Sequence, residues 1–119
     1  MRKIQKPWGH EEVWAETPAY VGKVLHIEAG HRLSLQHHER KDETLRVERG
    51  VLEVDLEDDA GVLVRTRMGP GESFHVPPKR KHRMKAITVC DVVEVSTPEL
   101  HDVVRHEDDY GRLPPTSSS

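Results

Sequence analysis

The stretch LSLQHHERKDETLRVERG, residues 33–50, places a histidine pair shortly before a glutamate. Glu43 has the strand parity of Leu45 and Val47, so we expect it on the face that these apolar residues bury. A buried carboxylate is costly unless a partner neutralises it. The position of Glu43 therefore indicates an interior site that holds a positive charge.

Two neighbouring segments supply groups of the kind that bind metals. Gln36 and His38 share a face with Ser34 and can enter the same interior as Glu43, and His82 shares its parity with inward-facing apolar or small residues. A metal ion held by these side chains would neutralise the carboxylate. Zinc with N and O ligands and one open position fits best, with manganese, iron, nickel and cobalt as alternatives.

The other histidines are weaker candidates. His37 has the opposite parity to His38, which indicates an exposed neighbour rather than a ligand. His75 shares its parity with Ser73, and the pattern leaves open whether it lines the interior or faces outward.

Short strands must position these residues, because Gly and Pro recur at short intervals between runs rich in Val, Leu, Ile and Thr. Strands are expected at residues 12–16, 20–28, 32–38, 43–49, 51–57, 62–68, 72–76, 82–88 and 90–96. A turn is expected at residues 49–50, and the only weak helical turn is at 98–109. The pattern predicts an all-β jelly roll or small barrel: one domain over residues 1–112 and a flexible tail over 113–119.

Composition narrows the class of protein. The chain has 119 residues, of which 34% are hydrophobic and 33% are charged, so its core is thin and a homodimer is expected to support it. A net charge of -3 gives no indication of nucleic-acid or membrane binding. One cysteine, no signal peptide and no apolar run of membrane-spanning length predict a cytoplasmic protein.

Two motifs resemble those of the cupins. The first runs Gly, five residues, His, any residue, His, three or four residues, Glu, six residues, Gly. It is matched here by Gly30, Gln36, His38, Glu43 and Gly50, with Gln36 at the first histidine position. The resemblance implies a cupin-type double-stranded β-helix, which is a jelly-roll barrel.

The second cupin motif runs Gly, five residues, Pro, any residue, Gly, two residues, His. It is matched by Gly71, Pro77 and His82, while Lys79 stands at the usual glycine. The two motifs together imply Gln36, His38, Glu43 and His82 as metal ligands, in agreement with strand parity.

A glutamine among the ligands resembles the phosphomannose isomerases, whose zinc is held by Gln, His, Glu and His. The isomerase domain at the C-terminal end of bifunctional mannose-6-phosphate isomerase/mannose-1-phosphate guanylyltransferase enzymes is similar over residues 6–112. The similarity rests on KPWG at 6–9, LSLQ at 33–36 and VRHEDDYGR at 104–112. The guanylyltransferase domain is absent, so that activity is not expected.

The resemblance also suggests catalytic and substrate-binding residues. It favours Arg83 near the metal, within the basic run 79–85, where a phosphate of the substrate would bind. Glu94 is the candidate general base, and Lys23 and Lys41 are further candidates for substrate binding.

Three functions follow as hypotheses. The first is interconversion of mannose 6-phosphate and fructose 6-phosphate, with a sugar phosphate as the partner. The second is a non-catalytic cupin that binds a sugar or sugar nucleotide, suggested by Lys-Asp-Glu-Thr-Leu at residues 41–45 where the family has Arg-Ala-Glu-His-Trp. The third is another metal-dependent cupin enzyme such as an oxygenase, which Gln36 disfavours.

Overall fold

The computed structural model describes residues 2–99 and 101–113, and within them it contains eleven strands and no helix. The strands are β1 (Arg2–Lys6), β2 (Gly9–Glu16), β3 (Val21–Ile27), β4 (Leu35–His37), β5 (Glu43–Arg49), β6 (Leu52–Glu57), β7 (Leu63–Met68), β8 (Ser73–Val76), β9 (His82–Ala86), β10 (Cys90–Ser96) and β11 (Val104–Glu107). In the same residues no helix is long and apolar enough to span a membrane. The all-β prediction is confirmed.

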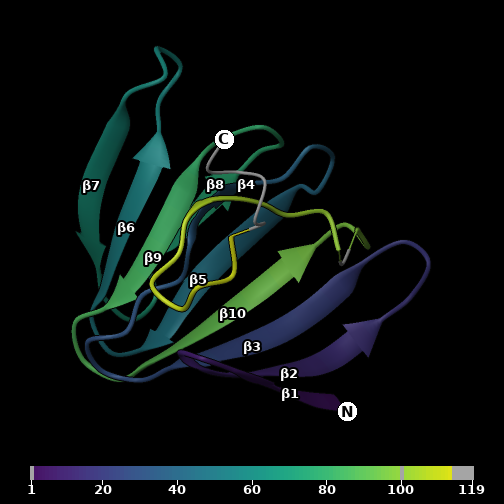
Figure 1. Cartoon of the computed structure of the whole chain (residues 1–119). Coiled ribbons are helices and arrows are strands. Elements are labelled where there is room, and N and C mark those ends of the chain that lie inside the picture. Colours follow the sequence, from purple (N-terminus) through teal and green to yellow (C-terminus); the bar gives the residue numbers. More distant parts are fainter. Residues whose placement is uncertain (1, 100, 114–119) are drawn as a thin grey trace.

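The strands form two antiparallel sheets that enclose one interior (Figure 1). The six-stranded sheet has the order β1-β2-β3-β10-β5-β8, and the five-stranded sheet has the order β11-β4-β9-β6-β7. Strands distant in sequence therefore lie side by side, such as β5 beside β10 and β4 beside β9. This order brings the segments around residues 38, 43 and 82 to one region.

Alternation of apolar and polar residues explains which side of each strand is buried. In β5 the residues Glu43, Leu45 and Val47 are buried, while the intervening side chains are exposed. The expected turn between β5 and β6 is present, with Gly50 at φ 90°. A Cβ at Gly50 would lie 2.1 Å from the carbonyl oxygen of Val89, so only glycine fits there.

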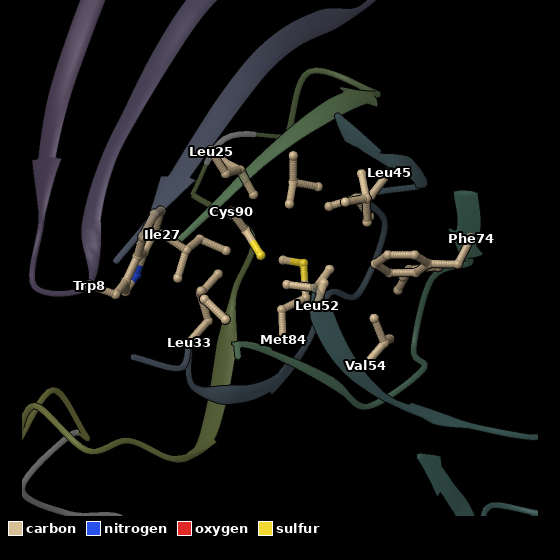
Figure 2. Packing of buried hydrophobic residues seen from close by; sticks show 14 residues of the cluster. Trp8, Leu25, Ile27, Leu33, Leu45, Leu52, Val54, Phe74, Met84 and Cys90 are labelled. Carbon is tan, nitrogen blue, oxygen red and sulfur yellow. The ribbon is translucent and has the colours of Figure 1, made fainter. Parts of the chain in front are cut away.

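The interior has an apolar half and a polar half, which follow one another along the strands. One half is apolar and contains the cluster drawn in Figure 2, in which Leu25, Leu45, Leu52 and Met84 contribute from four different strands. The other half holds buried polar side chains. These are Lys23, Ser34, His38, Lys41, Glu43, His82, Glu94 and Ser96. A single strand thus contributes to both halves.

At the ends of the chain one expectation was wrong and one strand had not been expected. Residues 104–107 form strand β11 rather than part of a helical turn, because they pair with β4. An unexpected strand, β1, covers residues 2–6 by pairing with β2 at the edge of the larger sheet. In addition, β4 is shorter than the expected 32–38. Most of the expected tail, residues 114–119, lies outside the described residues.

Candidate metal centre

Three of the four predicted ligands meet in the polar half of the interior. His38 follows β4, Glu43 begins β5 and His82 begins β9. All three are buried, and one ligand atom of each lies within 4.8 Å of the others. His38 and His82 pack with ring centroids 5.1 Å apart. We refer to His38, Glu43 and His82 as the triad.

Backbone carbonyl groups orient both histidines of the triad. Nδ1 of His38 lies 2.5 Å from the carbonyl oxygen of Asp102, and Nδ1 of His82 lies 3.0 Å from that of Arg80. A carbonyl oxygen only accepts hydrogen bonds, so each Nδ1 carries the proton and each Nε2 presents a lone pair. Both Nε2 atoms and Oε2 of Glu43 are buried and make no well-formed hydrogen bond in the described residues, although Nε2 of His38 lies only 2.9 Å from Oε2 of Glu43. This donor set fits a divalent metal, since metal-bound histidines generally donate their other ring N–H to such a partner.

Gln36 completes the predicted set from an adjacent position. It pairs in register with His82 across β4 and β9, so both side chains leave the same face of the sheet. Its Oε1 accepts a hydrogen bond of 2.7 Å from the hydroxyl of Ser34. One lone pair of this oxygen stays available, so Gln36 can serve as a fourth ligand.

Lys41 neutralises the buried carboxylates. Its Nζ lies 3.3 Å from Oε2 of Glu43 and 3.1 Å from Oε2 of Glu94. Burial acts to raise the pKa of Glu43, but the contact with His38 and the charge of Lys41 outweigh it and lower this pKa to about 2. Burial lowers the pKa of His82, which favours the neutral form that a metal requires. The pKa of Lys41 is raised, because its two carboxylate partners outweigh its burial.

The carboxylate of Asp102 fixes the loop between β4 and β5. It accepts hydrogen bonds from the backbone N–H groups of Glu39 (3.0 Å), Arg40 (2.7 Å) and Lys41 (2.9 Å). These bonds, with that from Arg40 first, lower the pKa of Asp102 to about 2. Asp102 therefore positions both His38, through its carbonyl group, and the loop that carries Lys41.

The unusual lysine of the second cupin-like motif keeps the turn that a glycine would form. Lys79 has a φ of 69°, a left-handed conformation that favours glycine, and its N–H donates a 2.6 Å hydrogen bond to the carbonyl oxygen of His38. The turn before β9 is thus tied to the segment that carries His38.

A cavity of about 270 Å³ opens beside the triad. Four predicted site residues line it: Lys23, Gln36, His38 and Lys41. Lys23 is held by Glu11, with Nζ and Oε1 3.2 Å apart. Glu94 is buried behind Lys41 and is not among the lining residues.

The structure does not bring Arg83 to the triad. Arg83 follows His82 in β9, so its side chain leaves the opposite face of the sheet. There its guanidinium donates to the carbonyl oxygen of Leu33 (2.9 Å) and pairs with Glu107 (3.2 Å). No residue of the basic run 79–85 is among those that line the cavity.

The two other histidines that were weighed as ligands, His75 and His37, have partners outside the triad. His75 contacts Asp42 on the outside of the larger sheet, with Nε2 and Oδ1 2.6 Å apart, which settles its direction. His37 contacts His106 and Glu39. The only group of three potential metal-binding side chains of the His, Cys, Asp and Glu types in the described part of the chain is the triad.

The cavity-lining residues that sequence reasoning missed include Glu11, Asp102 and Arg105. Glu11 lies opposite Leu25 in the pairing of β2 with β3, and an earlier start for β2 would have placed it on the inward face. Arg105 lies in β11, where a helical turn was expected, so no strand parity was assigned to it.

Comparisons with curated proteins identify relatives involved with sugars. Over 117 residues the chain is 30% identical to the mannose-1-phosphate guanylyltransferase ManC of Salmonella typhimurium, a match that covers 94% of this chain and 23% of ManC. Over 116 residues it is 29% identical to the xanthan biosynthesis protein XanB of Xanthomonas campestris, covering 93% of this chain and 24% of XanB. The chain thus spans about a quarter of the length of these relatives.

A solved structure and a family model identify the fold and the family of the chain. The structure of KdgF from Halomonas sp. matches with a TM-score of 0.75 and a sequence identity of 25%. The match covers 86% of this chain and 90% of the KdgF chain. The model of the Cupin domain family matches residues 23–96, a span that contains Gln36 and the whole triad. Because this match covers more than half of the sequence and the fold is that of the cupin double-stranded β-helix, the chain belongs to the Cupin domain family.

Proposed function

We propose that this protein is a metal-dependent sugar-phosphate isomerase that interconverts mannose 6-phosphate and fructose 6-phosphate. The observation that carries the proposal is the triad, which gathers three potential ligand atoms beside a cavity that His38 lines together with five Lys or Arg side chains. The similarity to a mannose-1-phosphate guanylyltransferase and a xanthan biosynthesis protein supports a sugar substrate. The cavity, at about 270 Å³, has room for a ligand of about monosaccharide size.

The triad and Gln36 would hold the metal, for which we propose zinc. Bound there, the ion would act as a Lewis acid that polarises the carbonyl group of the open-chain sugar. The buried surroundings of the triad exclude water, which strengthens such electrostatic interactions.

The reaction moves a proton between two adjacent carbons. A base removes the proton from C2 of the aldose, the C–H electron pair forms the C1–C2 double bond, and the carbonyl oxygen at C1 takes up a proton to give an enediol. Return of a proton to C1, with loss of the proton from the oxygen on C2, leaves the ketose. The chain must therefore supply a base and a cation near the developing negative charge.

Lys41 and Glu94 are the groups that we assign to these roles. The raised pKa of Lys41 keeps its ammonium group protonated, so Lys41 is suited to stabilise the oxyanion. Glu94, whose buried Oε2 lies 3.1 Å from Nζ of Lys41, is the proposed base. Lys41 separates Glu94 from the cavity, so the proposal requires Lys41 to move aside or to relay the proton.

The test is an isomerase assay on protein stripped of metal and reloaded with zinc or manganese. We expect turnover of mannose 6-phosphate that disappears in His82→Ala together with bound metal. The matched control is His75→Ala, which removes an exposed histidine outside the interior. Metal-loaded protein that fails to interconvert the two sugar phosphates would refute the isomerase.

One observation favours a second function, a non-catalytic cupin that binds a sugar phosphate. The carboxylates of Glu43 and Glu94 both pair with Lys41, so neither is free to act as a base in this conformation. Thermal stabilisation by mannose 6-phosphate without turnover would support this alternative.

We also propose that the protein is a homodimer and that it is cytoplasmic. The support for the dimer is an apolar strip on the outer face of the larger sheet, where Trp14 and Tyr20 are 51% and 56% exposed and Val95 is 49% exposed. Trp14 lies over Gly22, which pairs in register with Val95. Sedimentation should show a dimer that Trp14→Glu dissociates, whereas a wild-type monomer at micromolar concentration would contradict it.

A further inference from the structure

The cavity beside the triad carries an excess of positive charge. Five of its lining side chains are Lys or Arg and two are Asp or Glu. Three of the five cations have acidic partners, because Arg2 pairs with Glu16, Lys23 with Glu11, and Lys41 with Glu43 and Glu94. Among the described residues, Lys6 and Arg105 have no such partner.

Arg105 is the better placed of these two cations. It lies directly opposite Gln36 in the pairing of β11 with β4, and Gln36 lies opposite His82 in the next strand. Residues in register on adjacent strands share a face, so Arg105 belongs to the same interior as the triad. Two strand spacings amount to about 10 Å between Arg105 and His82.

The Arg105 side chain is partly buried and has no polar contact with another side chain among the described residues. Its Nε is buried and has no hydrogen-bond partner in the described residues. Burial and then the charge of Arg112 lower the pKa of this guanidinium, and only the charge of Asp108 opposes them. An uncompensated cation is costly in such a place, which indicates that a ligand supplies the missing negative charge.

Asp108 does not supply that charge by a direct contact, because Arg112 occupies it. The backbone N–H of Arg112 donates to the Asp108 carboxylate at 2.6 Å, and its Nε and Nη2 donate at 3.1 and 2.8 Å. The Asp108 side chain is completely buried. A carboxylate that is already paired in this bidentate manner has little capacity left for a second guanidinium.

We propose that Arg105 anchors the phosphate group of the ligand in this cavity, and that Arg112 keeps Arg105 available by holding Asp108. A planar guanidinium matches a phosphate through two parallel hydrogen bonds. With the phosphate at Arg105, an open-chain hexose can extend across the cavity and bring its carbonyl end to the triad. The identity of the ligand as a sugar phosphate rests on the proposed function, whereas the anion site rests on Arg105 itself.

The test measures binding calorimetrically on the full chain stripped of metal, so that phosphate cannot bind to an ion instead. The probes are inorganic phosphate, mannose 6-phosphate and mannose. We expect Arg105→Gln to weaken both phosphate-containing probes at least tenfold and Arg105→Lys to weaken them less, with mannose unaffected. The matched control, Arg46→Gln, removes an exposed arginine on the outer face of the larger sheet and should change nothing.

A second set of variants tests the role of Arg112. Arg112→Gln should free Asp108 to pair with Arg105 and weaken phosphate binding severalfold, and the double variant Asp108→Asn/Arg112→Gln should restore it. Thermal unfolding of each variant verifies that the fold is kept. Unchanged phosphate affinity in Arg105→Gln, or no phosphate binding by the wild type, would overturn the anchor. Unchanged affinity in Arg112→Gln would overturn the part assigned to Arg112.

The two proposals fail in different ways. Arg105-dependent phosphate binding without isomerase turnover would refute the proposed reaction and support the anchor. Isomerase turnover, together with phosphate binding that does not depend on Arg105, would support the proposed reaction and refute the anchor.

Discussion

Nδ1 of His38 lies 2.5 Å from the carbonyl oxygen of Asp102, a residue 64 positions further along the chain. The carboxylate of the same aspartate holds the backbone of residues 39–41. Asp102 therefore connects the segment before β11 to His38 and to the loop that leads from His38 to Glu43. The orientation of a predicted metal ligand depends on a residue that no metal-binding motif includes.

Replacement of Asp102 by alanine should weaken metal binding. The loop that follows His38 and carries Lys41 loses three backbone partners, while the Asp102 carbonyl group that contacts His38 remains. The expected loss of metal affinity is therefore about 10-fold, the lower end of the effect of outer partners. Competition with a chromophoric chelator measures the affinity. The control is Asp58→Ala, because Asp58 caps the turn at residues 58–62 in a similar way at the far hairpin. Equal zinc affinity in Asp102→Ala and the wild type would contradict the prediction.

The metal-free protein should lose stability in acid through Glu43. The pKa of this carboxyl group is lowered from 4.5 to about 2 on folding, so its contribution is fully present above pH 4.5 and is lost as the pH falls towards about 2. Urea unfolding at pH 7 and pH 3 should show a smaller loss for Glu43→Gln than for the wild type. Some pH dependence should persist, because Asp102 titrates in the same range. Identical losses for both proteins would show that Glu43 is not held ionised by its neighbours.

Lys79→Gly should leave the protein as stable or make it more stable. A left-handed conformation costs a residue other than glycine about 1–2 kcal/mol, while glycine costs about 0.5–1 kcal/mol in the unfolded chain. The expected gain is about 0.5 kcal/mol in the free energy of unfolding. Lys81→Gly is the control, because Lys81 has no left-handed backbone and should lose stability. A loss for Lys79→Gly as large as that for Lys81→Gly would mean that the Lys79 side chain stabilises the turn.

Substitution of two carboxylates should identify the base. Glu94→Gln should lower kcat by about 10²–10⁴-fold at unchanged metal content, as loss of a general base does. Glu11→Gln should instead raise KM, because Glu11 holds the cavity-lining Lys23. Steady-state kinetics on zinc-loaded protein distinguishes these effects. A larger kcat effect for Glu11→Gln would transfer the role to Glu11.

Strand parity predicted the interior direction of Glu43 and His82 because each begins a strand with a clear apolar face. The inward direction of His38 came instead from its shared parity with Ser34 and Gln36, since the short β4 has no buried apolar face. The same parity sends Arg83 to the opposite face of β9, and only family resemblance had suggested it near the metal. A shift of one residue reverses the direction of a side chain in a strand, so resemblance without parity is a weak guide to function.

The ends of the fold were less predictable. Strand β1 is polar and exposed at three of its five residues, so it shows little of the alternation that marks a buried strand. Strand β11 is short and has an irregular register after Arg105, and its acidic surroundings suggested a turn. Both strands acquire their structure from pairing with a neighbour, which sequence periodicity does not record.

The separation of the interior into an apolar and a polar half has a consequence for the evolution of this protein. The apolar half contains the side chains whose loss would unfold the chain, and they come from the same strands that carry Lys23, Glu94 and His82. Substitutions in the polar half can therefore alter what is bound without disturbing the packing that defines the barrel. Single substitutions in the polar half can therefore change ligand specificity during evolution while the fold is kept.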